Sequence, residues 1–234
     1  MLDTNRPPEG SPTGVNGSDW CPVSCSSPLP TRVVLLTGPS GSGKSSLAAR
    51  SGLPVLRLDD FYKEGDDPTL PLVEGGSSDI DWDSPLSWDA DTAVAAIEEL
   101  CAAGRTEVPV YDIATSSRTG TEALDISRTP LFIAEGIFAA DIVARCQELG
   151  LLADAICLRG RPSTTFRRRL VRDLREGRKS VLFLLRRGYR LMRAERGIVA
   201  RHTALGAHAC GRDEALGRLA AAAAGRHRAA VTPA

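Results

Sequence analysis

The sequence lacks the features that mark membrane, secreted and strongly basic proteins. None of its 234 residues lies in an apolar run long enough to cross a membrane, and the N-terminal part has no apolar signal core. The formal net charge is zero, from 29 basic and 29 acidic residues, which argues against a wholly basic nucleic-acid binder. We therefore expect a cytoplasmic protein with no membrane or nucleic-acid partner.

The cysteines and a missing nucleotide motif exclude two further classes. Among six cysteines only Cys21 and Cys25 lie close together, without a second pair or a histidine at zinc-site spacing. Cys101, Cys146 and Cys157 occur in apolar or helical surroundings, which favours buried free thiols. The sequence has no N-K-x-D run of the kind that reads guanine, which argues against a GTP-dependent switch.

The zero net charge hides a strong asymmetry along the chain. Between Asp59 and Glu99 the only basic residue is Lys63. From 167 to 201, twelve arginines and one lysine stand against three carboxylates, which leaves +10. This pattern favours a basic side for a polyphosphate and an acidic side for another ligand. A nucleic-acid surface is an alternative for the basic segment, but Phe183 and Tyr189 are its only aromatic residues.

A phosphate-binding loop is the most specific motif present. The stretch GPSGSGKSS follows an apolar, β-branched run and fits G-x-x-x-x-G-K-[ST]. The glycines allow consecutive N–H groups to turn toward phosphate oxygens, the lysine adds positive charge, and the next hydroxyl can ligate Mg²⁺. We predict that ATP and Mg²⁺ bind at Gly38, Pro39, Ser40, Gly41, Ser42, Gly43, Lys44, Ser45 and Ser46.

Strand-like and helix-like runs alternate after the loop, which predicts an α/β fold of the P-loop NTPase type, with a parallel sheet and helices on both faces. A Gly-, Asp- and Pro-rich stretch over 63–87 predicts a substrate-side insertion. We expect a disordered leader over 1–30, one kinase domain over 31–225 and a disordered tail over 226–234. The predicted strands are 33–37, 55–59, 131–134 and 154–158, and the predicted helices are 44–52, 89–103, 138–149, 162–176 and 214–224.

Carboxylates lie at the ends of two predicted strands, at the edge where ligands bind in such sheets. Asp59 and Asp60 lie at the end of the second strand, and Glu135-Gly136 follows the strand at 131–134. One carboxylate could take a proton from an attacking hydroxyl while the other holds Mg²⁺, directly or through water. A turn or helix cap is the alternative role for Asp59 or Asp60.

An arginine-dense helical segment, which includes Thr165–Asp173, predicts a lid over the transferring phosphoryl group. Charge runs are usually solvated, and several of these arginines fit that description. We expect Arg172 to act on the γ-phosphoryl group, with Arg169 as the second candidate.

Motifs in one consistent order resemble the uridine kinase family of nucleoside kinases, from about Val33 to Lys179. They are the loop itself, LDDFYK against D-S-F-Y, DWDSP against N-F-D-H-P, VPVYDIATSSR against I-P-V-Y-D-F-x-x-H-S-R, AEGIF against F-E-G-I-L, and RRLVRD against R-R-V-L-R-D. One such motif would be weak, whereas six in register are specific.

The resemblance implies roles for individual residues. Asp59 matches the general base for a ribose 5′-hydroxyl, and Asp83 matches a carboxylate that holds ribose hydroxyls. Tyr62 and Tyr111 match aromatic residues around the base, although core packing would also explain them. The resemblance also implies that Arg118 contacts the substrate and that Glu135 binds the metal. Three arginines fall on or near the family's lid and phosphate-contacting positions: Arg169, Arg172 and Arg178. Trp82 and Trp88 are interpreted as packing residues.

The chain departs from the family in two places. Ser116 stands where the family has the histidine that helps read the pyrimidine, and the family pattern ends after Lys179. We expect an ATP- and Mg²⁺-dependent kinase that phosphorylates the 5′-hydroxyl of uridine or cytidine, with the oligomeric state open. A kinase for pantothenate, a sugar phosphate or another nucleoside is an alternative, as is an ATP-binding regulatory protein.

Overall fold

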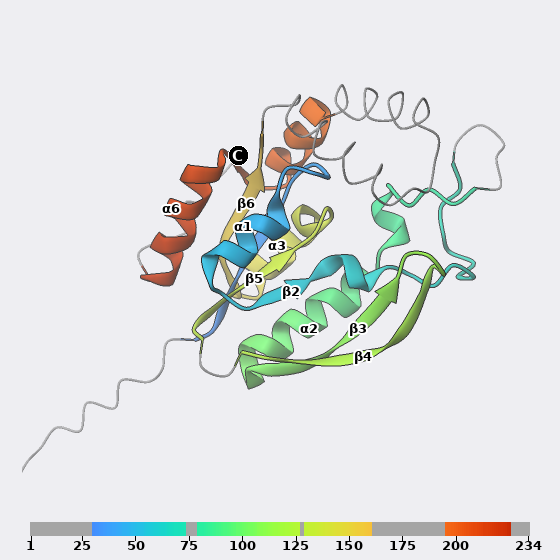
Figure 1. Ribbon diagram of the computed structural model, residues 1–234, viewed down its shortest axis with the longest axis horizontal. Helices are drawn as coiled ribbons and strands as arrows, with labels where there is room; N and C mark the ends of the chain where they lie inside the picture. The colour runs from blue at the N-terminus through green and yellow to red at the C-terminus, as the bar shows by residue number, and fades with distance from the viewer. Residues whose placement is uncertain (1–29, 74–78, 127–128, 161–194, 226–234) are drawn as a thin grey trace, which may run out of the picture.

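The computed structural model describes residues 30–73, 79–126, 129–160 and 195–225. A five-stranded parallel sheet forms the centre, in the order β2-β5-β1-β6-β7 (Figure 1). Its strands are β1 (Arg32–Thr37), β2 (Val55–Arg57), β5 (Leu131–Glu135), β6 (Leu152–Leu158) and β7 (His208–Cys210). The described α-helices with both ends defined are α1 (Lys44–Ser51), α2 (Ala90–Ala103), α3 (Val143–Glu148) and α6 (Arg212–Ala223), and residues 195–204 are also helical.

Helices cover both faces of the sheet because alternate side chains of each central strand point to opposite sides. Val33 and Leu35 of β1 lie in one core with residues of α2 and α3. Val34 and Leu36 lie in the other core with residues of α1 and α6. All four side chains are fully buried. The predicted α/β fold of the P-loop NTPase type, with helices on both faces, is confirmed.

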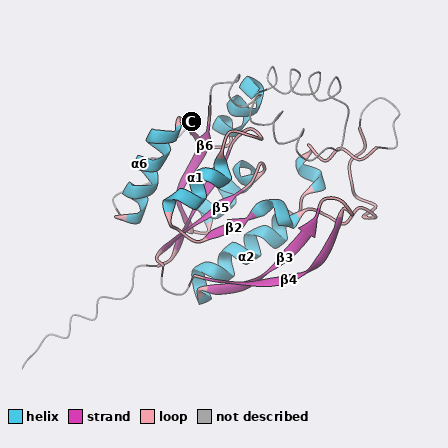
Figure 2. Cartoon of the chain, viewed as in Figure 1, coloured by secondary structure: helices cyan, strands magenta, loops and turns pink. Residues whose placement is uncertain are grey.

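An antiparallel hairpin outside the main sheet was not predicted. It consists of β3 (Arg105–Asp112) and β4 (Ser117–Asp125), and it packs against α2 and the 3₁₀ turn η1 (Leu58–Phe61) (Figure 2). Most of its residues are exposed or half-buried, because only one side of a two-stranded ribbon has a partner. The hairpin carries Tyr111 and Arg118 near its turn, at the end of β3 and the start of β4.

Several predicted boundaries were wrong. The strand predicted over 55–59 ends at Arg57, since η1 begins at Leu58 and places Asp59 on a tight turn. The helix predicted over 138–149 is a 3₁₀ turn, η3 (Ala139–Ile142), followed by the short α3. The helix predicted over 162–176 lies outside the described residues. A further 3₁₀ turn, η2 (Pro85–Ser87), interrupts the predicted insertion.

Four cysteines lie in the described part of the chain, and all are free thiols. Cys146, Cys157 and Cys210 are buried, and Cys101 is half-buried. Burial raises the pKa of the Cys146 thiol to about 12, which keeps it protonated at neutral pH. No helix among the described residues has the length and apolar character needed to cross a membrane.

Candidate active site

The phosphate loop joins the end of β1 to the start of α1. Gly38, Gly41 and Gly43 have φ values of 138°, 78° and 99°, a backbone region that L side chains rarely adopt. A Cβ on Gly38 would lie 2.4 Å from the carbonyl oxygen of Leu158, so the loop packs directly on the end of β6. The sequence pattern and the backbone therefore agree on the need for glycine here.

The loop has the polar groups that a bound polyphosphate needs. The Lys44 ammonium is buried and donates to the carbonyl oxygen of Gly38 at 3.0 Å. The Ser42 hydroxyl is also buried, and within the described part of the chain it has no hydrogen-bond partner. A buried hydroxyl normally has a partner, so this one fits a loop built to accept a further ligand. The residues present therefore fit the phosphates of ATP.

Ser45 and Glu135 lie together beside the loop and fit a Mg²⁺ ion. Glu135 ends β5 and is 8% exposed, and its carboxylate is hydrogen-bonded by the Ser45 side chain. Burial raises the pKa of Glu135, while the Ser45 hydrogen bond and the charge of Lys44 act against that rise. A hydroxyl and a carboxylate next to a phosphate loop are the oxygen donors that Mg²⁺ prefers.

Asp59 lies at the same edge of the sheet as the loop. β2 pairs with β5 so that Arg57 is opposite Glu135. The residues that follow the two strands, η1 after β2 and Gly136 after β5, therefore lie next to each other. The main-chain N–H of Ile137 donates to Oδ1 of Asp59 at 3.4 Å. A Cβ on Gly136 would lie 2.8 Å from Cβ of Leu58 and 3.1 Å from this Oδ1, so the close approach requires glycine. Asp59 itself is exposed, as a group that meets a substrate must be.

Aromatic rings gather next to Asp59. Around Tyr62, the rings of Trp82, Tyr111 and Phe138 lie at centroid distances of 5.8, 5.8 and 5.9 Å. Burial and the charges of Asp59 and Asp83 raise the pKa of Tyr62, which means that both carboxylates lie near this phenol. The predicted substrate residues Asp59, Tyr62, Asp83 and Tyr111 are therefore brought together by the fold.

A cavity of about 730 Å³ opens beyond the aromatic cluster. It has three carboxylates and no Lys, Arg or His among its described lining residues, which are Glu64, Gly65, Asp66, Asp79, Ile80, Trp82, Thr115, Ser116 and Ser117. Trp82, interpreted from the sequence as a packing residue, lines this cavity. Trp88 is a packing residue, as predicted: it is 3% exposed, and its indole nitrogen donates to the carbonyl oxygen of Leu58 at 2.7 Å.

Two backbone contacts fix the wall of the cavity. The N–H of Gly65 donates to the carbonyl oxygen of Ser116 at 2.8 Å, and the N–H of Arg118 donates to the Glu64 carboxylate at 3.1 Å. Ser116 has a φ of 51°, in the left-handed region that non-glycine residues rarely adopt. The Arg118 guanidinium turns away to Asp89 at 3.4 Å, so only its backbone faces Glu64. Glu64 was not predicted, although it follows Tyr62 by two residues in the acidic stretch.

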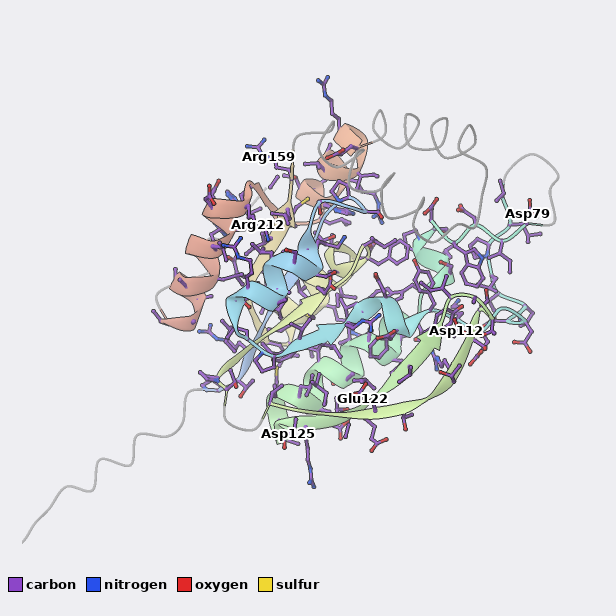
Figure 3. The ribbon with its side chains drawn as sticks, in the orientation of Figure 1. Asp79, Asp112, Glu122, Asp125, Arg159 and Arg212 are labelled. Carbon is purple, nitrogen blue, oxygen red and sulfur yellow. The ribbon has the colours of Figure 1, made fainter. Side chains whose placement is uncertain are left out.

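A second cationic group that the sequence reasoning missed reaches the phosphate side. Arg212, the first residue of α6, donates to the Ser46 hydroxyl at 2.8 Å. Figure 3 shows Arg212 and Arg159 together near α1 and α6, with Asp79 and Asp112 at the opposite end of the molecule. Asp79 belongs to the acidic stretch of the sequence, whereas most of the basic segment 167–201 lies outside the described residues. The predicted lid residues Arg169, Arg172 and Arg178 lie outside the described residues.

Comparison with known proteins identifies the family. No family model matches the chain. A uridine kinase from Chloroflexus aurantiacus is 32% identical over 158 residues, which cover 64% of this chain and 71% of that enzyme. A uridine kinase from Bacillus cereus is 28% identical over 62% of this chain and 68% of that enzyme. The inorganic pyrophosphatase TTM2 of Arabidopsis thaliana is 30% identical over 46% of this chain, which spans only 15% of that protein. The chain belongs to the uridine kinase family of ATP-dependent P-loop kinases.

Proposed function

We propose that this protein transfers the γ-phosphoryl group of ATP to the 5′-hydroxyl of a pyrimidine nucleoside, uridine or cytidine. The observation that carries the proposal is the position of Asp59. Its carboxylate lies at the sheet edge that holds the phosphate loop, and it also lies beside the aromatic cluster. A general base in that position lies between the site of the phosphate donor and the site of the acceptor.

The chain's own residues would divide the work as follows. Asp59 would accept the proton of the acceptor hydroxyl as its oxygen bonds to the γ-phosphorus, while the bond between that phosphorus and the bridging oxygen breaks and ADP leaves. Tyr62 and Tyr111 offer an aromatic surface on which the nucleobase stacks, and Asp83 accepts hydrogen bonds from ribose hydroxyls. Ser45 and Glu135 hold Mg²⁺, and Lys44 binds phosphate oxygens. Bound ATP supplies the phosphoryl group, and bound Mg²⁺ partly neutralises the negative charge of the phosphates.

The charge of the cavity favours a neutral acceptor over the anionic alternatives. Glu64, Asp66 and Asp79 contribute carboxylates to the lining. Pantothenate and sugar phosphates carry negative charge at neutral pH, so they would meet repulsion from this wall. A nucleoside carries none, and its hydroxyls and ring N–H groups can donate to carboxylate oxygens. We propose a cytoplasmic enzyme of pyrimidine salvage that needs neither nucleic acid nor a membrane.

An acceptor panel tests the proposal. Purified protein with Mg²⁺ and ATP is mixed separately with uridine, cytidine, purine nucleosides, pantothenate and ribulose 5-phosphate, and ADP formation is followed. We expect turnover on uridine or cytidine that Asp59→Asn abolishes. Turnover on pantothenate or the sugar phosphate alone would replace the nucleoside proposal with another kinase activity. ADP formation that needs no acceptor would favour an ATP-binding regulatory protein instead.

A further inference from the structure

A buried histidine lies beneath the phosphate loop and has no counterpart among the predicted site residues. His202 belongs to the helical residues 195–204 and is 3% exposed. Its Nδ1 lies 3.2 Å from the hydroxyl of Thr37, the last residue of β1 before Gly38. Nδ1 also lies 3.8 Å from the sulfur of Cys157 on β6. The imidazole therefore contacts the ends of two central strands at the site edge.

The direction of the hydrogen bond follows from the protons available. The Thr37 hydroxyl donates its single proton to the carbonyl oxygen of Ile137 at 3.2 Å. It must therefore accept from His202, whose Nδ1 carries a hydrogen. Burial and the neighbouring charge of Arg201 lower the pKa of His202 to about 4, so the ring is neutral at pH 7. The neutral tautomer with hydrogen on Nδ1 donates to the Thr37 hydroxyl.

The residue whose carbonyl accepts from Thr37 also holds Asp59 through its N–H. The carbonyl of Ile137 accepts from the Thr37 hydroxyl, and its N–H donates to Oδ1 of Asp59. The Ile137 backbone is thus held from both sides, through groups on β1 and on η1. His202 fixes the hydroxyl that holds the carbonyl.

The helical residues that carry His202 are themselves anchored. Both terminal guanidinium nitrogens of Arg201 donate to the carboxylate of Asp141 on η3, and one of the distances is 3.3 Å. The carbonyl oxygen of His202 accepts from the N–H of Ala207 at 3.0 Å. These contacts fix the backbone that carries His202, and the buried imidazole contacts the Thr37 hydroxyl from that position.

We propose that His202 is a positioning residue for phosphoryl transfer, acting through Thr37 and the backbone of Ile137 to hold the Asp59 carboxylate against the acceptor hydroxyl. The proposal rests on the proposed role of Asp59 as the base. It assigns a function to a part of the chain where the family pattern is absent from the sequence. Because this series of contacts ends at Asp59, breaking it lowers kcat and leaves ATP binding largely intact.

Paired variants at both hydrogen-bonding positions test this. His202→Leu and Thr37→Val each remove the bond, and we expect each to lower kcat about tenfold, with the KM for ATP changed less than about twofold. The double variant should lose no more than either single variant, because both break one chain of contacts. His202→Asn keeps an N–H donor, so its kcat should fall less than that of His202→Leu. Thr37→Ser keeps the hydroxyl, so its kcat should fall less than that of Thr37→Val.

A second readout does not depend on activity. The ¹⁵N–¹H resonance of Ile137 should shift in Thr37→Val and His202→Leu and return toward its wild-type position in His202→Asn. Thr37→Val preserves side-chain shape, so it carries the test if His202→Leu fails to fold. Multiplying losses in the double variant, a raised KM for ATP with unchanged kcat, or an unmoved Ile137 resonance would each overturn the proposal.

The two proposals can fail separately. If the wild-type protein phosphorylates a different acceptor from the panel, the kcat comparison is made with that acceptor and the nucleoside proposal alone is lost. If Asp59→Asn remains active, the proposed base is lost and the inference about His202 falls with it, whatever the amide resonance shows.

Discussion

Arg218 of α6 holds the carboxylate of Asp154 on β6 through two hydrogen bonds, from its Nε at 2.9 Å and from a terminal nitrogen at 2.6 Å. The Asp154 side chain is 5% exposed, although it lies in a strand of the central sheet. A carboxylate buried to this degree is stabilised only while its partners remain. This ion pair therefore attaches the C-terminal helix to the sheet.

Removing the arginine should destabilise the fold. We expect Arg218→Leu to lower the free energy of unfolding by about 1.5–3 kcal/mol, because the buried carboxylate loses two charged donors. Arg145→Leu is the matched control: its partner Asp91 is 89% exposed, and such pairs contribute about 0–1 kcal/mol. Urea unfolding of both variants measures the difference. Equal losses would mean that burial of Asp154 does not matter.

The loop lysine should be required for turnover. Lys44→Ala removes the buried ammonium that contacts Gly38 and faces the phosphate site, so we expect kcat/KM for ATP to fall about 10²–10³-fold. Arg50→Ala, at the exposed C-terminal end of the same helix, is the control and should change kcat/KM little. Steady-state kinetics with varied ATP decides, and comparable losses in the two variants would contradict the prediction.

The glycine after Glu135 should not tolerate a side chain. Gly136→Ala places a methyl group 2.8 Å from Leu58 and 3.1 Å from Asp59, so the two strand ends must move apart. We expect a loss of about 1–3 kcal/mol in stability and lower kcat. In Gly120→Ala the added Cβ meets nothing within 4 Å, so that variant should stay active and folded. Thermal unfolding and the ADP assay measure both effects.

The acidic wall should select among neutral acceptors. The Glu64 carboxylate can accept from the exocyclic amino group of cytidine or the ring N–H of uridine, but it repels the two carbonyl oxygens that flank that N–H; a carboxamide can also donate to those oxygens. We therefore expect the wild-type protein to prefer cytidine over uridine, and Glu64→Gln to reduce that kcat/KM ratio about 5–10-fold. Asp112→Asn, outside the described cavity lining, serves as the control. An unchanged ratio in Glu64→Gln would remove Glu64 from base recognition.

Stability should depend on the ionisation of His202. Its pKa is lowered from 6.5 to about 4 in the folded protein, so the unfolded chain binds the extra proton between these values. The free energy of unfolding should therefore rise with pH from about 4 to about 6.5, with His202 contributing at most about 1.4 kcal/mol per pH unit. His202→Asn removes this contribution. Urea unfolding of both proteins at several pH values should give a smaller slope for the variant, and equal slopes would contradict the prediction.

The sequence was sufficient for those parts of the site that depend on local chemistry. The loop glycines, Lys44 and the carboxylates at strand ends could be predicted because each residue type serves its own turn or strand end. The hairpin β3–β4 could not, since most of its residues are exposed or half-buried and give no clear alternation. β7 has only three residues, too few to show any period.

Contacts between distant residues were out of reach for a different reason. His202 and Thr37 are 165 residues apart, and neither has a neighbour in the sequence that signals their hydrogen bond. Glu64 faces the cavity only because Gly65 and Ser116 meet across two loops. Such pairings arise from the packing of the finished fold, which no single segment encodes.

The central position of β1 has a consequence for how the chain is made. β1 pairs with β5, which begins at Leu131, and with β6, which begins at Leu152. During synthesis the first strand therefore has neither neighbour until those segments have left the ribosome, and such non-local pairing is slow. Gly38 also rests on Leu158, so the phosphate loop is complete only then. We therefore expect ATP to bind late in folding and to stabilise only chains in which β1 has already paired with β5 and β6.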